Sequence, residues 1–300
     1  MTIQLFDQAL PHGITLSCRS SGPEDAPRRV LLLHGFPEGA FIWDEVMQRI
    51  GAAARCIAPN LRGYERSSAP AAVEAYRARH LVDDVAALIE AIGAPIDLLV
   101  AHDWGGGVAW NLAAQRPTLI RQLMIVNSPH PATFLRELRD NPAQQAASAY
   151  MTYLCRPDAA ALLAENDFAG LWPFFTNMGG AAWLNDDLRA AYRALWQHGL
   201  DGPLNYYRAS PLRPAQAPGD PINRLMFAPA FVTVERPTTV LWGEADIALT
   251  PALLDGLEAF VSPLDVQRVP DASHWIVHER PALVADTIAR LLLRPRRTDP

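Results

Sequence analysis

The stretch that decides the fold is Leu98-Leu99-Val100-Ala101-His102-Asp103-Trp104-Gly105-Gly106-Gly107. In this stretch a run of apolar residues changes abruptly into small residues, and an amphipathic pattern follows as far as Ala113. Such a sequence predicts a buried strand, a sharp turn and a helix. Asp103 falls at the apex of the expected turn, with Ala101 two residues before it and Gly105 two residues after it.

The spacing around Asp103 is that of a nucleophile elbow, whose usual form is Gly-x-Ser-x-Gly. Small residues flank the apex of such an elbow because larger side chains would clash in so tight a turn. In this chain the apex has a carboxylate instead of a hydroxyl. An aspartate at that position attacks carbon and leaves an alkyl ester on the enzyme. This chemistry suits the opening of an epoxide or the displacement of a halide, and it does not suit ester cleavage through a serine acyl-enzyme.

The composition favours a soluble globular protein with a sizeable core, because half of the 300 residues are apolar. A formal net charge of −6 gives no reason to expect nucleic acid as a partner. The sequence lacks an apolar run of about 18 residues, so we expect no membrane-spanning helix. The first residues also lack the pattern of a secretory signal.

The cysteines indicate a cytoplasmic protein. Cys18, Cys56 and Cys155 are odd in number, far apart and without the spacing of metal ligands, which fits reduced thiols. The sequence shows neither a P-loop nor a histidine cluster nor a dinucleotide fingerprint. We therefore expect no cofactor and no metal ion. Either a monomer or a homodimer is compatible with the sequence.

The order of the expected elements predicts a mostly parallel sheet flanked by helices, because apolar strand-like runs alternate with amphipathic helix-like stretches. Gly35-Phe36-Pro37 adds a rigid bend, in which the Phe36–Pro37 bond can be cis. The expected strands are residues 4–10, 13–20, 30–33, 55–59, 98–100, 122–127, 238–242 and 265–269. The expected flanking helices are 41–50, 79–92, the helix that follows Asp103, and 282–293.

Between residues 133 and 230 the strand signals disappear. Helical stretches rich in Ala, Leu and aromatic residues replace them, at 143–154, 159–163, 186–198 and 204–207. We interpret this segment as a helical cap inserted into the sheet domain; the alternative is that its helices are simply more scaffold. The first interpretation divides the chain into a core of residues 1–132 and 231–300 and a cap of residues 133–230.

Three candidate catalytic residues follow expected strands: Asp103, Asp246 and His274. Ligands of open α/β sheets bind beyond the carboxyl ends of the strands, where these residues are expected to meet. The order nucleophile, acid, histidine is that of the α/β-hydrolase arrangement. Glu244 is an alternative for the acid and His278 is an alternative for the base.

Each residue has a chemical role in this scheme. Asp103 attacks the substrate as a carboxylate, and hydrolysis of the resulting ester needs a base, for which the imidazole of His274 is suited. Asp246 would orient this imidazole and stabilise its protonated form. The backbone N–H groups of Trp104 and Phe36 are candidates for an oxyanion hole. We expect two further histidines, His34 and His102, to be structural and to form hydrogen bonds in the turns.

Taken together, these residues resemble the epoxide hydrolases of the α/β-hydrolase fold, and the resemblance covers essentially the whole chain. It includes the motifs His34-Gly35-Phe36-Pro37-Glu38, Arg62-Gly63-Tyr64, His102-Asp103-Trp104-Gly105-Gly106, Asp246 and His274-Trp275.

Two segments of the expected cap are the more discriminating part of this resemblance. Gly202-Pro203-Leu204-Asn205-Tyr206-Tyr207-Arg208 and Ala149-Tyr150-Met151-Thr152-Tyr153-Leu154 resemble the family segments that each contain an epoxide-binding tyrosine. By position, the resemblance implies Tyr150 and Tyr207, with Tyr153 and Tyr206 as near alternatives. The chemistry agrees, because the epoxide oxygen becomes an alkoxide as the ring opens, and phenol hydroxyls can donate to it.

The sequence departs from the family pattern at two positions. Glu65 follows Arg62-Gly63-Tyr64 where Gly is common, and Gly107 follows the elbow where bulkier residues also occur. Neither position has a catalytic role, but both bear on the shape of the pocket. The expected partners are accordingly a small apolar epoxide and water.

Two other functions remain open from the sequence. A haloalkane or haloacid dehalogenase would share Asp103, His274 and the cap, and Trp104 could help to bind a halide. However, Phe36 stands where an Asn would serve a haloalkane, and an Arg next to the nucleophile, expected for a haloacid, is missing. The second alternative is a member of the fold that binds a small ligand without catalysis, although such a protein has no need of a base beside a carboxylate.

Overall fold

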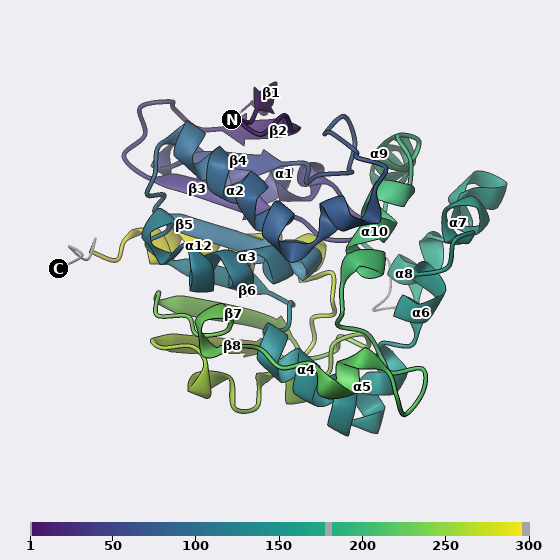
Figure 1. The fold of residues 1–300 in the computed structure, drawn as a ribbon. Helices are drawn as coiled ribbons and strands as arrows, with labels where there is room; N and C mark the ends of the chain where they lie inside the picture. The colour runs from purple at the N-terminus through teal and green to yellow at the C-terminus, as the bar shows by residue number, and fades with distance from the viewer. Residues whose placement is uncertain (1, 178–181, 296–300) are drawn as a thin grey trace.

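The computed structural model describes residues 2–177 and 182–295, and these residues form one eight-stranded sheet (Figure 1). The strand order across the sheet is β1-β2-β4-β3-β5-β6-β7-β8. The strands are β1 (Gln4–Ala9), β2 (Thr15–Ser21), β3 (Arg29–Leu33), β4 (Arg55–Pro59), β5 (Leu98–His102), β6 (Leu123–Val126), β7 (Thr238–Gly243) and β8 (Leu264–Val269).

The sheet is mostly parallel, as the sequence predicts. Strand β2 pairs antiparallel with β1 and with β4, and the pairs from β4 to β8 are parallel. Every residue of β5, β6 and β7 is buried. This explains why these strands are continuous apolar runs rather than alternating patterns, since both faces of a central parallel sheet are covered.

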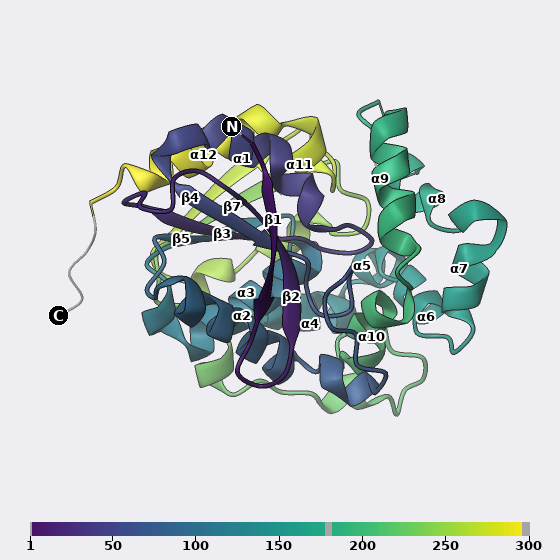
Figure 2. The same ribbon diagram turned by 90° about the horizontal axis from the view of Figure 1, so that it is seen from above.

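Helices cover both faces of the sheet (Figure 2). On one face lie α1 (Asp44–Ile50), α11 (Ile276–Glu279) and α12 (Pro281–Leu292). On the other lie α2 (Ala78–Ile92) and α3 (Asp103–Gln115), whose apolar residues pack with alternate residues of the strands. These two apolar layers form the core, and they fix the carboxyl ends of the strands along one edge.

Helices, and no strand among the described residues, lie between β6 and β7. Most of them stand to one side of the sheet (Figure 1), where their aromatic and aliphatic residues form a separate cluster with Phe36 and Trp275 of the core. The helices of this segment are α4 (Pro131–Asp140), α5 (Pro142–Ala147), α6 (Tyr150–Leu154), α7 (Ala159–Phe168), α8 (Trp172–Thr176), α9 (Asp186–Trp196) and α10 (Asp201–Ala209).

The boundaries in this helical segment differ from the sequence prediction. The single helix expected over 143–154 is two helices, which are separated at Ser148 and Ala149. The break occurs where Gln144 turns its amide to Ser148 Oγ and to the carbonyl of Ala248 in the core, contacts that the amphipathic pattern does not encode. Helices α4 and α8 were not expected. Residues 178–181 of the segment, like 296–300, lie outside the described residues.

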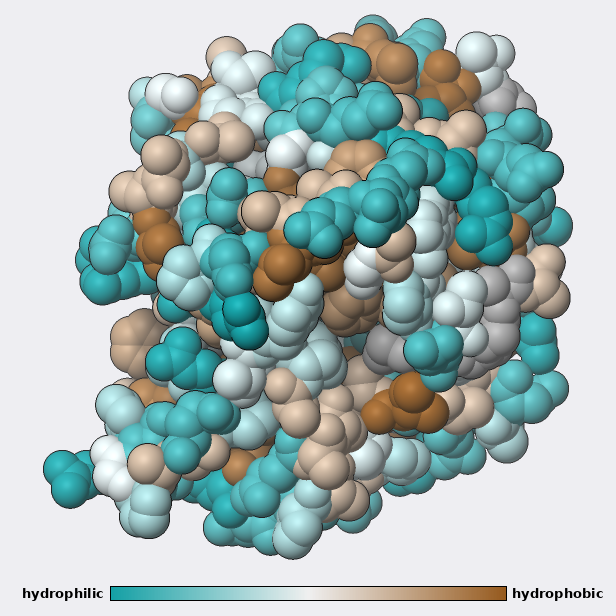
Figure 3. All heavy atoms as spheres, turned by 90° about the vertical axis from the view of Figure 1, so that its right-hand side faces the viewer, coloured by the Kyte–Doolittle hydropathy of each residue, from teal (hydrophilic) through white to brown (hydrophobic). Residues whose placement is uncertain are grey.

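Hydrogen bonds from the helical segment to core loops hold it over the edge of the sheet. The indole N–H of Trp196 in α9 donates to the carbonyl of Pro37 at 2.7 Å. The hydroxyl of Tyr206 in α10 donates to the carbonyl of Arg62 at 3.0 Å. The Phe36–Pro37 bond is cis, as the sequence allows. The surface on this side is a mixture of hydrophilic and hydrophobic residues (Figure 3).

Within the part of the chain that the structure describes, none of the helices combines the length and the apolar character needed to cross a bilayer.

Candidate active site

Asp103 sits on the sharp turn between β5 and α3 that the sequence predicts. Its φ is +47°, in the left-handed region that a residue with a side chain rarely adopts. A Cβ at Gly35 would lie 2.2 Å from Asp103 Oδ1, so only glycine lets the loop after β3 pass this carboxylate. The turn and the neighbouring loop together hold the Asp103 side chain in place.

Two glycines after Asp103 are required by the same close packing. A Cβ at Gly105 would lie 2.5 Å from the carbonyl oxygen of His34, and a Cβ at Gly106 would lie 2.3 Å from Ser128 Cβ. Both glycines therefore let α3 begin directly against the ends of the neighbouring strands. Ser128 also donates from its hydroxyl to the carbonyl oxygen of Asp103 at 2.6 Å, which ties the turn to the loop after β6.

The two backbone groups expected to form an oxyanion hole belong to Phe36, which contacts Asp103 in space, and to Trp104, which follows it in the chain. The N–H of Phe36 donates to Asp103 Oδ1 at 2.8 Å. The N–H of Trp104 belongs to the first turn of α3, where backbone donors have no acceptor within the helix. Both groups can therefore stabilise negative charge that develops on the Asp103 carboxyl group.

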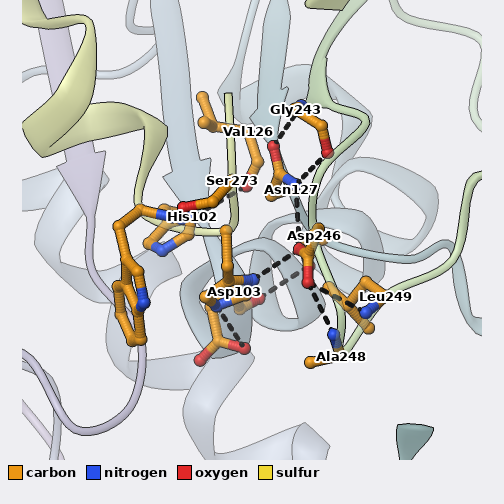
Figure 4. A network of polar contacts seen from close by, with 12 residues as sticks. His102, Asp103, Val126, Asn127, Gly243, Asp246, Ala248, Leu249 and Ser273 are labelled. Atoms are coloured by element: carbon orange, nitrogen blue, oxygen red, sulfur yellow. Dashed lines mark hydrogen bonds and ion pairs between the residues drawn. The ribbon is translucent and has the colours of Figure 1, made fainter. Parts of the chain in front are cut away.

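Asp246 and His274 form a buried pair at the ends of β7 and β8 (Figure 4 shows the surroundings of Asp246). His274 Nδ1 lies 2.7 Å from Asp246 Oδ2, which also accepts from Asn127 Nδ2 at 2.9 Å. Asp246 Oδ1 accepts from the N–H groups of Ala248 and Leu249 at 2.8 and 3.0 Å. Because His274 Nδ1–H donates to this carboxylate, the ring is held with Nε2 on the side away from Asp246.

The charges around the pair set its protonation. Burial by itself raises the pKa of Asp246, but the His274 imidazole and the hydrogen bonds from His274, Asn127 and Leu249 bring it below its usual value. Burial lowers the pKa of His274, whereas the carboxylates of Asp246, Asp103 and Glu38 raise it, and the result is a pKa of about 9. The imidazole is therefore held as a cation between carboxylates while Asp103 is charged.

The free nitrogen of His274 faces Asp103. Its Nε2 lies 3.8 Å from Asp103 Oδ2, and the Asp103 side chain is 15% exposed. This separation is too long for a hydrogen bond, and it brings the imidazole within one water molecule of the carboxyl group.

The alternative acid, Glu244, and the alternative base, His278, have other partners. Glu244 is paired with Arg268 of β8 at 3.0 Å. His278 lies on α11, where its Nε2 is 3.2 Å from Glu38 Oε1 and 2.8 Å from the Tyr192 hydroxyl. Neither side chain has a contact with Asp103 or His274 among the hydrogen bonds and ion pairs of the described residues.

Two further residues of the site were not singled out by the sequence analysis. Asn127 binds the backbone of Gly243 through both ends of its amide, in addition to Asp246. Its position directly after β6 was a signal that could have been used. Glu38 ends the motif His34-Gly35-Phe36-Pro37-Glu38; its side chain is fully buried, and its Oε2 lies 3.3 Å from His102 Nε2.

Both histidines expected to be structural form hydrogen bonds with the backbone, His34 in the loops after β3 and β4, and His102 between the ends of β5 and β6. His34 Nδ1 lies 2.9 Å from the carbonyl of Gly35, and its Nε2 accepts from the N–H of Leu61. Burial lowers the pKa of His34 to about 4, which keeps the ring neutral. His102 Nδ1 lies 3.0 Å from the carbonyl of Val126, and burial also lowers the pKa of this ring.

A cavity of about 180 Å³ opens above Asp103, and Tyr150 and Tyr207 both line it. Burial, followed by the charge of Asp103, raises the pKa of Tyr150. Burial and then the neighbouring Tyr150 and Asp103 raise the pKa of Tyr207. Both phenols are therefore protonated at neutral pH and able to donate.

The two near alternatives among the tyrosines are placed differently. Tyr206 also lines the cavity, but its hydroxyl donates to the carbonyl of Arg62. Tyr153 lies under the guanidinium of Arg156 and is 37% exposed, and it is not part of the cavity wall.

Within residues 2–177 and 182–295, no cluster of three or more His, Cys, Asp or Glu side chains is arranged to hold an ion.

Comparisons with known proteins identify the family. The family model described as alpha/beta hydrolase fold matches residues 28–281. The chain is 34% identical over 285 residues to the AB hydrolase superfamily protein YfhM of Bacillus subtilis (strain 168). This alignment covers 94% of this chain and 95% of that protein. The chain is also 30% identical over 279 residues to Epoxide hydrolase 4 of Mus musculus, with 90% and 74% covered.

The similarity to a solved structure supports the same family. The Bacillus megaterium epoxide hydrolase, determined in complex with an inhibitor, superposes with a TM-score of 0.88 at 31% identity, over 96% of this chain and 100% of that one. The chain belongs to the epoxide hydrolases of the α/β-hydrolase fold. It is thus a hydrolase, as expected from the sequence.

In this family member, one departure from the common motif has a structural explanation. Glu65 has a φ of +49°, which is the left-handed conformation that favours Gly. Its carboxylate accepts from Ser17 Oγ and from Asn60 Nδ2, each at 2.5 Å. These charge-assisted hydrogen bonds offset the unfavourable backbone conformation.

Proposed function

We propose that the protein opens small apolar epoxides to vicinal diols through a covalent ester on Asp103. The proposal rests mainly on one observation: among the described residues that line the cavity, Asp103 is the only one with a charged side chain, and the phenols of Tyr150 and Tyr207 line the same cavity. An uncharged, apolar substrate is what such a cavity favours. The helices of residues 133–230 serve as the cap that encloses it.

In the first step, an oxygen of Asp103 attacks an epoxide carbon, and the bond from that carbon to the ring oxygen breaks. The ring oxygen takes the electron pair and receives hydrogen bonds from Tyr150 and Tyr207, one of which supplies a proton. Because the buried phenols have raised pKa values, they remain donors until alkoxide forms. The product of this step is a hydroxyalkyl ester of Asp103.

In the second step, His274 removes a proton from a water molecule, which attacks the carboxyl carbon of the ester. The negative charge of the tetrahedral intermediate is stabilised by the N–H groups of Phe36 and Trp104. The intermediate collapses as the bond from the carboxyl carbon to the substrate oxygen breaks, and this oxygen takes a proton from the His274 imidazolium and leaves in the diol. The proton of the resulting Asp103 carboxyl group returns to the phenolate formed in the first step, which regenerates the Asp103 carboxylate and the phenol. Asp246 stabilises the imidazolium that forms, and Asn127 holds Asp246 in place.

A single-turnover reaction in oxygen-18 water tests this proposal, with enzyme in excess over a panel of terminal and aryl epoxides. We expect a diol without label after the first turnover, and label in the Asp103 carboxyl group, because the oxygen transferred to the substrate comes from Asp103. Label in the first diol would mean direct attack by water and would overturn the covalent mechanism. Haloalkanes and haloacids in the same panel, scored for halide release, test the dehalogenase alternative, and ligand binding without any turnover would favour a non-catalytic protein.

A further inference from the structure

One wall of the cavity follows the axis of α3. Asp103, Gly107 and Asn111 all line the cavity and recur at intervals of four residues, so they lie on one face of this helix. At a rise of 1.5 Å per residue, the wall from Asp103 to Asn111 extends for about 12 Å. Ala78 and Pro211, which also line the cavity, are exposed, so the cavity opens to solvent beside them.

Gly107 stands at the middle of this wall, and packing does not require glycine there. A Cβ at Gly107 would have only Trp104 Cε3 near it, at an ordinary contact distance of 3.8 Å. In contrast, a Cβ at Gly105 or Gly106 would clash with backbone or with Ser128. Glycine within a helix is less favourable than alanine, so the fold gains nothing from glycine at position 107. The missing side chain leaves space in the cavity that a ligand can occupy.

The residues that line the cavity and its volume indicate which kind of ligand part can occupy this space. The rest of the lining is mainly apolar and aromatic, with Leu81, Val108, Phe134 and Phe227 among its residues. Its size of about 180 Å³ compares with cavities of about 150 Å³ that hold a benzene molecule. It can therefore take one aromatic ring or a short alkyl chain without charge.

We propose that Gly107 determines the length of substrate that this protein accepts. The uncharged arm of a terminal epoxide lies along α3 over Gly107 and points toward Asn111, while the epoxide ring is at Asp103. This rests on the proposed function, because the position of the ring is taken from it. Epoxides with one extended alkyl or aryl arm are then preferred over short ones, and a side chain at position 107 reverses that preference.

The test compares the natural chain with Gly107→Ala, Gly107→Leu and a control, Gly219→Leu. Gly219 is exposed, lies outside the cavity and would have nothing within 4 Å of an added Cβ. The substrates are 1,2-epoxybutane, 1,2-epoxyhexane, 1,2-epoxyoctane and styrene oxide. In the natural chain we expect kcat/KM to rise roughly fourfold for each methylene that becomes buried.

In Gly107→Leu we expect kcat/KM for epoxyoctane and styrene oxide to fall at least tenfold, and that for epoxybutane to change less than threefold. Gly107→Ala should lie between, and Gly219→Leu should keep the natural profile. Thermal melting checks that each variant is folded; if the Leu variant is not, Gly107→Val takes its place. An unchanged length profile in a folded Leu or Val variant, with turnover in the natural chain, overturns the role of Gly107 and leaves the proposed function standing.

Binding of the corresponding 1,2-diols, measured by calorimetry, separates the two proposals. We expect affinity in the natural chain to rise with length, and this rise to be lost in Gly107→Leu. If the diols behave so but no epoxide is turned over, the proposed function fails and Gly107 remains a determinant of ligand length. If affinity is independent of length in every variant, the inference about Gly107 is wrong whether or not turnover is seen.

Discussion

His274 is held between two carboxylates at unequal distances: its Nδ1 lies 2.7 Å from Asp246 Oδ2, and its Nε2 lies 3.8 Å from Asp103 Oδ2. Burial lowers the pKa of the imidazole, but these charges together bring it to about 9. Asp103 becomes neutral when it is alkylated, and it then no longer raises the pKa of His274. The proposed first step therefore lowers the pKa of His274 and prepares it to act as the base of the second.

The raised pKa of His274 predicts a pH-dependent contribution to stability. Its folded value of about 9 lies above the unfolded value of 6.5, so the folded state binds the proton more tightly. The contribution is fully present below pH 6.5 and is lost as the pH rises through 9. We expect it to reach about 3 kcal/mol. Urea unfolding of the natural chain and of His274→Gln should show a difference that shrinks across this window; parallel curves would contradict the charge arrangement.

The two proposed steps should separate when His274 is replaced. His274→Gln keeps Asp103 able to attack but removes the base, so we expect hydrolysis of the ester to slow by about 10²- to 10⁴-fold. The alkyl-enzyme should then accumulate and appear in intact-protein mass spectra as the mass of the protein plus one epoxide. Asp103→Ala is the matched control and should show no adduct and no diol. An adduct in Asp103→Ala would mean that another residue is the nucleophile.

The cap tyrosines should act on the first step alone. We expect Tyr150→Phe combined with Tyr207→Phe to slow alkylation at least 100-fold, because the alkoxide loses both donors. The rate can be followed by tryptophan fluorescence, to which Trp104 contributes from beside the site, since it packs against Tyr207 with ring centroids 5.0 Å apart. Tyr206→Phe and Tyr153→Phe are the controls. Alkylation at an unchanged rate in the double variant would remove these phenols from the mechanism.

Much of the fold and the core of the site can be predicted from sequence because the signals are local. The turn at Asp103 is determined by small residues within a few positions of it. The strand before Asp246 is a short buried run, and the strand before His274 alternates apolar and polar residues. The contacts of Asn127 and Glu38 are different in kind. Asn127 meets Asp246 across 119 positions, and Glu38 meets His278 across 240. These partners are brought together only by the strand order and the packing of α11, which a pattern of residues does not show.

Asn127 should stabilise the acid through its amide and the turn through its backbone. Its φ is +39°, so Asn127→Ala removes the hydrogen bonds and also leaves an unfavourable backbone conformation. Asn127→Gly removes the same bonds without that conformational cost. We expect the free energy of unfolding of both variants to fall by about 1–3 kcal/mol, because polar groups of Gly243 and Asp246 lose their partner. For Asn127→Ala we expect a further loss of about 1 kcal/mol from the backbone conformation. Denaturant unfolding measures both, and equal stabilities would show that the backbone at 127 is not strained.

Glu38 should contribute stability with the opposite pH dependence to His274. Burial raises its pKa, but the hydrogen bond with His278 and the charges of His102, His278 and His274 bring it below the ordinary value of 4.5. A carboxyl group with a lowered folded pKa stabilises the protein above its unfolded value, and this contribution is lost as the pH falls through the folded one. We therefore expect Glu38→Gln to be less stable by about 1–3 kcal/mol at neutral pH, with a difference that disappears in acid.

Tyr192→Phe is the matched control for Glu38→Gln. Its hydroxyl donates to Glu38 Oε1 at 3.2 Å, so this variant removes a neutral donor from the same oxygen while the charge of Glu38 remains. Its loss of stability should consequently vary less with pH than that of Glu38→Gln. Urea unfolding between pH 3.5 and 7 compares the two. If Glu38→Gln lost the same free energy of unfolding at every pH, Glu38 would contribute through its shape and neutral hydrogen bonds. Its charge would then have no part in the interaction with the neighbouring imidazoles of His102, His274 and His278.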